Sequence, residues 1–397
     1  LGSYTGSDHN GNDKSIAGYV TGPIINDVLA YSLSLYARDM AGYLTNDVTG
    51  QGTGGHEKWF ARGKLLWEPS ENTSIELHFF KTDRQDLETF ATTALNGNSS
   101  AAFWDDGIVA SRAWHVATEL KGGSQPLLVK QESFSLKISH YFDGVGTLTS
   151  TTSANDYQTE FTVDLDTGTS AACKATFVCA DFFQDYPSED FQQEFLFTSD
   201  PMGKLSFVAG LYFYENDAGF DGNFAPVINS TGYAIRDQSL AGFISGSTVF
   251  VESQALFGSL TYEISDQLRL TLGGRYNDES IVGVGTYSGK VFPNGGELSD
   301  KTFTPRVAVH FDISDTLSIY GSYTEGRKGP ILQSFSTADD YADYEDVEAI
   351  ELGIKASGDN YRFNGAIFSY DYKNFQDQVW DGSASLLGNA ESAEMKG

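Results

Sequence analysis

The longest polar stretch between hydrophobic segments, at about residues 84 to 129, carries large aromatic side chains and a nearby arginine. These residues are Phe103, Trp104, Trp114 and Arg112. Aromatic faces stack on planar groups and a guanidinium pairs with anions, so the set suits a planar or anionic small ligand such as a catecholate chelate. The same side chains would also suit packing within the stretch or an interfacial aromatic girdle, and the sequence leaves these alternatives open.

Catalytic chemistry has no comparable support in the sequence. We find no glycine-rich phosphate loop, no cluster of metal ligands, and no Ser-His-Asp arrangement with supporting context. We therefore expect no enzyme activity, no cofactor and no resident metal. The chain has 54 acidic and 25 basic residues, a net charge of −29, which argues against a nucleic-acid partner because polyanions attract basic surfaces.

One acidic stretch is a separate candidate site. Its acids are Asp339, Asp340, Asp343, Glu345, Asp346 and Glu348. One interpretation is a solvated loop kept open by self-repulsion. The other is binding of divalent cations, either alone or as a bridge to anionic lipid headgroups.

In the segments that connect these candidate sites, apolar and polar residues alternate with a period of two. From residue 303 to 311, apolar residues occupy the odd positions and polar residues the even ones, and the pattern resumes at 317 after a short turn. Successive side chains of a strand point to opposite faces, so this segment is predicted to be an antiparallel hairpin with one apolar and one polar face. The same alternation recurs along the 397 residues in about sixteen predicted strands.

The connections between these strands alternate between short turns of about two to six residues and long loops of about 7 to 45. Outer-membrane barrels have this asymmetry, with short periplasmic turns, long extracellular loops and apolar faces toward lipid. No run of about 18 apolar residues occurs, so a transmembrane helix is not expected. We predict an all-β, antiparallel transmembrane β-barrel in contact with outer-membrane lipid and lipopolysaccharide. The alternative, a soluble carbohydrate-binding β protein, would stay in solution without detergent.

Several short motifs carry a family resemblance across essentially the whole chain. They are GP at 22–23, DVLAY at 27–31, RDMAGY at 38–43, LGGRY at 272–276, FTPRV at 303–307, IYGSY at 319–323, GR at 326–327 and GAIFSYDY at 365–372. In their order and spacing the chain resembles the barrel of the TonB-dependent outer-membrane receptors. The resemblance implies a barrel of about 22 strands, an N-terminal plug domain and a TonB box.

Against that family pattern, residues 1–397 are expected to be a partial barrel, without the plug and without the C-terminal strands. The function that the resemblance implies is active uptake of a scarce small molecule or metal chelate, commonly a ferric siderophore. The TonB complex would act through the plug. The alternative is a passive porin, since a barrel of about sixteen strands leaves an aqueous channel.

Charged residues at the polar positions of the strands are predicted to face the barrel lumen. They are Arg62, Lys64, Arg269, Arg275, Arg306 and His310. A charge on the lipid side near the midplane would cost about 2 to 4 kcal/mol, so we place them inside, opposite Leu268, Leu270 and Leu272. They would pair either with acids of a plug or with one another across the barrel wall.

Cys173 and Cys179 lie close together in one predicted loop, and their spacing lets two Cα atoms approach the roughly 5.5 Å of a disulfide. Export through the oxidising periplasm favours that bond, and two free thiols are the alternative. So small a ring constrains the unfolded chain by only about 2 kcal/mol, so the bond would stiffen one loop tip and matter little to the barrel.

We therefore predict that neither Cys173 nor Cys179 reacts with an alkylating reagent before reduction. Mass spectrometry of the unreduced protein measures this directly. Alkylation of both residues without a reductant would contradict the bridge.

Overall fold

The computed structural model describes residues 2–3, 12–46, 50, 52–86, 115–116, 127–164, 181–225, 243–287, 290–292, 296–332, 341–380 and 385–397. Strands and their turns make up nearly all of these residues. Within the described ranges, no helix is long and apolar enough to cross a membrane.

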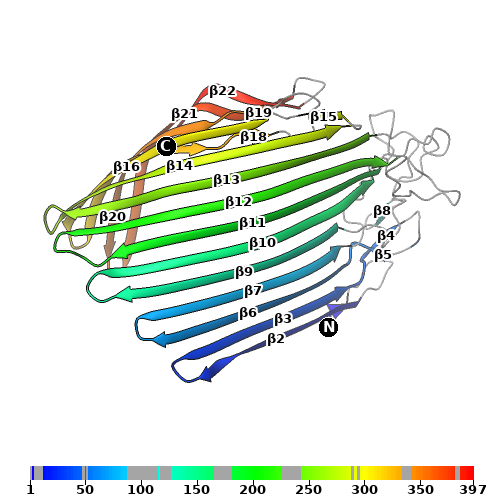
Figure 1. The fold of residues 1–397 in the computed structure, drawn as a ribbon, viewed down its shortest axis with the longest axis horizontal. Helices are drawn as coiled ribbons and strands as arrows, with labels where there is room; N and C mark the ends of the chain where they lie inside the picture. The colour runs from blue at the N-terminus through cyan, green and yellow to red at the C-terminus, as the bar shows by residue number, and fades with distance from the viewer. Residues whose placement is uncertain are drawn as a thin grey trace.

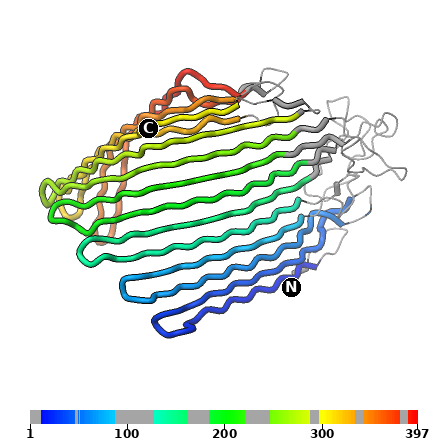
Figure 2. The backbone as a smooth tube through the Cα atoms, in the orientation of Figure 1, coloured from blue at the N-terminus to red at the C-terminus, as the bar shows by residue number. Residues whose placement is uncertain are grey.

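The long described strands form one large antiparallel sheet in which strands that follow one another in the chain also lie side by side (Figure 1). The sheet is curved, and its last strands, orange to red, arch over the others (Figures 1 and 2). Its fifteen long strands are β2 (Asn12–Ile25), β3 (Leu29–Met40), β6 (His56–Ser70), β7 (Thr73–Asp86), β9 (Leu127–Phe142), β10 (Gly146–Asp164), β11 (Asp181–Ser199), β12 (Leu205–Ala225), β13 (Phe243–Glu263), β14 (Leu268–Tyr287), β16 (Glu297–Ser314), β17 (Leu317–Lys328), β20 (Glu345–Gly358), β21 (Tyr361–Trp380) and β22 (Ser385–Lys396).

The remaining strands are short. In the main sheet, β1 (Gly2–Ser3) pairs with β2 and β15 (Lys290–Phe292) pairs with β14. Near the long connections, β4 (Leu44–Asn46), β5 (Gly52–Thr53) and β8 (His115–Val116) form a small sheet, and β18 (Ile331–Leu332) pairs with β19 (Tyr341–Ala342). The sequence predicted about sixteen strands, and the difference lies at the start of the chain, where the expected strand end is only the two-residue β1.

The two faces of the main sheet differ as the alternation predicted. One face, called here the apolar face, presents large side chains that remain exposed in the isolated chain. Examples are Leu35, Phe79, Phe134, Phe195, Leu211, Leu256, Leu272, Val307, Ile319 and Leu352. Phe79 and Phe134, for example, are direct cross-strand partners on the adjacent strands β7 and β9, so the apolar residues form a continuous band. Such a band is unfavourable in water and suits a hydrocarbon environment. The opposite surface is the polar face.

Short connections of two to five residues join the strands at one end of the sheet. Ser265 Oγ accepts the backbone amides of Gln267 and Leu268, at 3.4 and 3.2 Å, and Ser314 Oγ accepts that of Thr316 at 3.3 Å. In these two turns a serine hydroxyl thus bonds backbone amides of the turn. Gly144 and Gly203 have φ angles of 69° and 65°, which favour glycine in such tight turns.

Several strands are longer than the sequence predicted. β12 and β13 have 21 residues each, about 70 Å at 3.3 Å per residue, whereas about ten residues suffice to cross a bilayer. β10 ends at Asp164 and β11 begins at Asp181, where the alternation predicted about 156 and 189. Beyond the apolar band both faces of a strand are in contact with water. Polar residues then suit both faces, so the alternation ends while the backbone hydrogen bonds between strands continue.

The face assignment predicts a contrast between two neighbouring arginine substitutions in the full-length protein. Leu272→Arg places a charge on the apolar face and should destabilise the folded protein in lipid by about 2 to 4 kcal/mol. Thr271→Arg, on the polar face of the same strand, should cost less than about 1 kcal/mol. Urea titration of refolding into lipid vesicles, read from heat-modifiable gel mobility, compares them. Equal effects of the two substitutions would contradict the assignment.

Candidate functional site

The cations that the sequence predicted to face the lumen all lie on the polar face, and three strands carry them. They are Arg62 and Lys64 of β6, Arg269 and Arg275 of β14, and Arg306 and His310 of β16. Leu268, Leu270 and Leu272 alternate with the cations of β14 and so point to the apolar face. That the polar face lines a lumen stays a prediction.

Near the short-turn end, one carboxylate contacts two of these residues. Arg269 Nη2 lies 3.1 Å from Asp312 Oδ2, and His310 Nε2 lies 2.9 Å from Asp312 Oδ1. Arg269 and His310 are direct cross-strand partners of β14 and β16. Mutual pairing along the wall, one of the two predicted alternatives, therefore holds for this pair.

Arg275 has different surroundings. Its guanidinium lies 5.1 Å from the ring centre of Tyr212 and 5.7 Å from that of Phe257. Its hydrogen bonds go to Asn277 Oδ1, from Nε at 3.4 Å and from Nη2 at 3.2 Å. Rings and a neutral amide thus hold this cation where a carboxylate holds Arg269.

Rings and cations form a second group on β3, β6 and β7, of which the sequence singled out Arg62 but none of the rings. Tyr36 stacks on Phe60 with ring centres 5.3 Å apart, and Phe60 lies 6.2 Å from Phe80. Lys58 Nζ lies 5.6 Å from the Tyr36 ring, and the Arg62 guanidinium lies 5.6 Å from the Phe80 ring. The signal in the sequence was aromatic residues at polar positions of the alternation, such as Phe60 beside Arg62.

The segments on either side of β18 and β19 fold onto the polar face. Gln376 of β21 fixes them, because its Nε2 donates to Gly329 O at 2.7 Å and to Asp343 O at 2.9 Å. Gly329 lies so close to β14 that a Cβ there would come within 2.4 Å of Glu279 Oε1. No pattern in the sequence predicts this contact, since it joins residues far apart in the chain.

Arg327 and Tyr344 lie next to each other in the same region. Arg327 Nε lies 3.0 Å from Asp300 Oδ2, and the Arg327 guanidinium lies 4.5 Å from the Tyr344 ring centre. Burial, reinforced by the nearby carboxylates of Asp300 and Glu279, raises the pKa of Tyr344 to about 12, so its hydroxyl stays neutral at physiological pH.

The acidic stretch at 339–348 is only partly a loop, because β20 already begins at Glu345. Glu345 accepts the backbone amide of Gln376 at 2.7 Å, and Glu348 pairs with Lys373 at 2.5 Å. Asp346 lies 3.6 Å from Arg327. These partners replace the solvated loop that the sequence suggested, while Asp339 and Asp340 lie outside the described residues. In the described part of the chain, no group of three or more His, Cys, Asp or Glu side chains could hold a metal ion.

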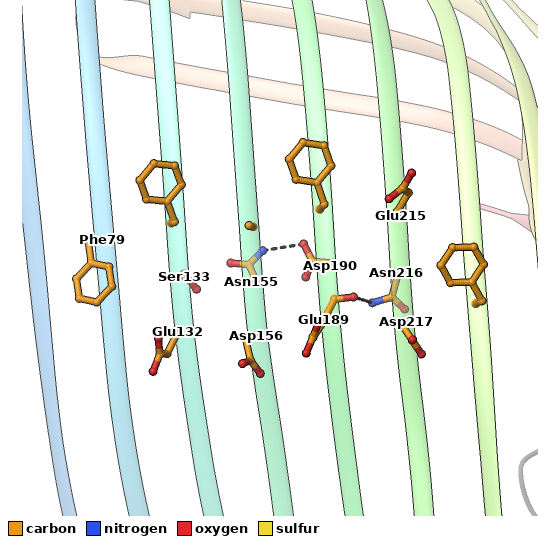
Figure 3. A pocket seen from close by; sticks show the side chains of 14 residues that line it. Phe79, Glu132, Ser133, Asn155, Asp156, Glu189, Asp190, Glu215, Asn216 and Asp217 are labelled. Carbon is orange, nitrogen blue, oxygen red and sulfur yellow. Dashed lines mark hydrogen bonds between the residues drawn. The ribbon is translucent and has the colours of Figure 1, made fainter.

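A row of acids also crosses the apolar face, at the edge of the aromatic band that is farther from the short turns. Asp156, Glu189 and Asp217 are direct cross-strand partners on β10, β11 and β12, beside a shallow pocket that Phe79 also lines (Figure 3). On the polar face behind them, Asn155 donates to Asp190 at 2.8 Å. Like charges directly opposite one another destabilise a sheet, so this row marks where the apolar band ends and a polar environment begins.

The remaining predicted residues lie outside the described ranges. They are Phe103, Trp104, Arg112 and Trp114 of the aromatic set, and Cys173 and Cys179. The ligand-contact and disulfide assignments for them stay predictions.

A family model described as TonB dependent receptor-like, beta-barrel, matches residues 36–397, which is most of the chain. The chain belongs to this family. The match confirms the resemblance, the all-β barrel class and an outer-membrane location, and it places the chain among receptors rather than enzymes. No curated protein matches the chain.

Solved structures share the fold at low sequence identity. The ferric yersiniabactin uptake receptor FyuA from Yersinia pestis has a TM-score of 0.70 and 16% identity, covering 97% of this chain and 56% of that one. The copper transporter OprC has a TM-score of 0.67 and 14% identity, covering 97% and 57%. The ferric preacinetobactin receptor BauA from Acinetobacter baumannii has a TM-score of 0.62 and 14% identity, covering 97% and 57%. This TonB-dependent receptor barrel thus spans little more than half the length of these proteins.

The contacts of Gln376 predict a local effect of substitution. Gln376→Ala leaves Gly329 O without its donor and should loosen residues 329–332 and 341–345 by about 1 to 3 kcal/mol. Amide hydrogen exchange there should become about tenfold faster or more. Gln378→Ala is the matched control, because that exposed side chain forms no hydrogen bond with the described residues. Unchanged exchange in the Gln376 variant would show that the contact does not hold the segment.

Proposed function

We propose that the chain is the barrel wall of an outer-membrane receptor that takes up a scarce small ligand, a ferric siderophore, by TonB-dependent active transport. The observation that carries the proposal is the family match over residues 36–397, joined to a polar face rich in cations and rings. FyuA and BauA are by their names receptors of ferric chelates, and OprC is a copper transporter, which supports a metal-bearing ligand.

In this proposal the polar face lines the lumen and the apolar face meets lipid. Arg62, Lys64, Arg275 and Arg306 then line the path of the ligand, whereas Arg269 is paired with Asp312 and His310 contacts the same carboxylate. In such proteins the strands usually form a rigid scaffold, and the side chains that recognise the ligand lie on the inner wall and in the loops. Phe103, Trp104, Arg112 and Trp114 would add contacts from the long connection after β7.

Coupling to energy belongs to the full-length protein. Members of this family are expected to contact the TonB complex through a plug domain, and we propose the same here. A passive porin, the alternative function, needs neither a plug nor energy, so energy dependence separates the two.

The test is uptake of a radioactive ferric siderophore by cells that express the full-length protein, compared with cells that lack its gene. We expect accumulation against a gradient that a protonophore abolishes, because the TonB complex depends on the proton-motive force. Uptake that continues unchanged with the protonophore would support the porin and contradict active transport.

The predicted ligand contacts have their own test. Replacing Phe103, Trp104 and Trp114 together with Ala should weaken ligand binding at least about tenfold, since stacked aromatic contacts are worth about 0.5 to 1.5 kcal/mol each. Binding is measured on folded, detergent-solubilised receptor. Unchanged affinity would assign these residues to packing or to the girdle.

A further inference from the structure

The cations of the polar face fall into two classes. One class forms ion pairs: Arg38 with Asp13, Arg84 with Asp86, Lys137 with Glu76, Arg269 with Asp312, and Arg327 with Asp300. The other class has no ion pair with any described carboxylate, and it includes Lys58, Arg62, Lys64, Arg275, Arg306 and Lys355.

A shortage of acids does not explain the second class, since the chain has 54 acidic and 25 basic residues. Four of the six lie against rings: Lys58 on Tyr36, Arg62 on Phe80, Arg275 on Tyr212 and Phe257, and Lys355 on Tyr320. The electron-rich face of a ring attracts a cation without neutralising its charge. These cations therefore keep their attraction for an anion.

Arg275 is the best defined of them. Its guanidinium lies over the rings of Tyr212 and Phe257, and its Nε and Nη2 both donate to the neutral Asn277 Oδ1. Glu279, the next acid on the same face of β14, forms no ion pair with it. A guanidinium has five N–H donors in a rigid fork, so Arg275 has donors left for the two oxygens of an anionic group.

The rings beside Arg275 offer a flat surface for a ligand. Tyr212 and Tyr214 lie nearly parallel, with ring centres 6.4 Å apart and 12° between their planes. The Tyr212 hydroxyl donates to Gln192 Oε1 at 3.2 Å, which fixes the ring. Glu194 is the direct partner of Tyr212 on the β11 side, away from β14. Its carboxylate would repel an anion, so the negative end of a ligand is favoured on the Arg275 side.

We propose that Arg275, Tyr212 and Phe257 form a subsite for the anionic, aromatic part of the ligand, a ring carboxylate or a ring-oxygen metal chelate. The receptor then prefers negatively charged aromatic chelates to neutral aliphatic ones. The proposal rests on the uptake function proposed above and narrows its ligand class. The group of Tyr36, Phe60 and Phe80 with Lys58 and Arg62 repeats the same chemistry on β3, β6 and β7.

The experiment compares two probes on the purified full-length receptor. One is the iron(III) complex of 2,3-dihydroxybenzoate, which is anionic and aromatic, and the other is a neutral iron(III) trihydroxamate. Intrinsic fluorescence titration gives both dissociation constants. Wild-type protein should bind the aromatic complex at least tenfold more tightly. Arg275→Gln should weaken that binding about tenfold or more and change binding of the hydroxamate less than twofold.

Two further variants separate charge from folding. Lys301→Gln is the matched control, because it removes one positive charge from the neighbouring strand β16, where Lys301 pairs with Asp278 across the apolar face. Its binding should match wild type. Arg275→Lys keeps the charge and should restore part of the affinity that Arg275→Gln loses. Heat-modifiable gel mobility shows that each variant is folded, and the comparison of the two probes on wild-type protein needs no variant.

The outcomes distinguish the two proposals. Tighter binding of the hydroxamate, or equal losses for both probes in Arg275→Gln, would overturn the subsite while leaving siderophore uptake in place. An Arg275→Gln variant with unchanged binding of the aromatic complex would do the same. Wild-type protein that binds neither iron complex would overturn both the subsite and the siderophore as ligand.

Discussion

Every backbone amide and carbonyl that lies in hydrocarbon must find its partner within the protein, and this constraint organises the whole sheet. The ladder between β12 and β13, for instance, runs without a register shift from Leu205 and Tyr262 to Phe224 and Phe243. With the backbone fixed in this way, side chains have only two directions to take. The alternation of apolar and polar residues, and the separation of the two faces, follow from that geometry.

The two faces handle charge in different ways. Beyond the apolar band, lysines on that side pair with acids of neighbouring strands, as in Lys81 with Glu132, Lys301 with Asp278 and Lys373 with Glu348. On the polar face, Arg62 and Arg275 lie against rings and keep their charge available. Exposed pairs of the first kind contribute little stability. The second kind leaves parts of the polar face locally positive in a protein of strongly negative net charge.

The barrel class and the face of each membrane-embedded residue could be predicted from sequence because lipid imposes a period of two. Leu272 and Arg275 followed that rule directly. The upper parts of β10 and β11 could not be predicted, because both of their faces meet water and the pattern disappears there. The bonds of Gln376 to Gly329 and Asp343 were also beyond prediction, since they join distant segments and depend on how a connection folds back. The cation–ring groups could have been predicted, because aromatic residues such as Phe60 occupy polar positions of the alternation.

The short turns have a consequence for how this protein tolerates changes in length. Gly358 pairs with Tyr361 across a turn of only two residues, and the ladder runs from there to Asp346 and Lys373 without a register shift. One added residue at this turn would shift the register and move the side chains of the following strand to the wrong face. A protein engineer who needs a site for a tag, or an evolving lineage that needs new sequence, therefore has little room at this end of the sheet.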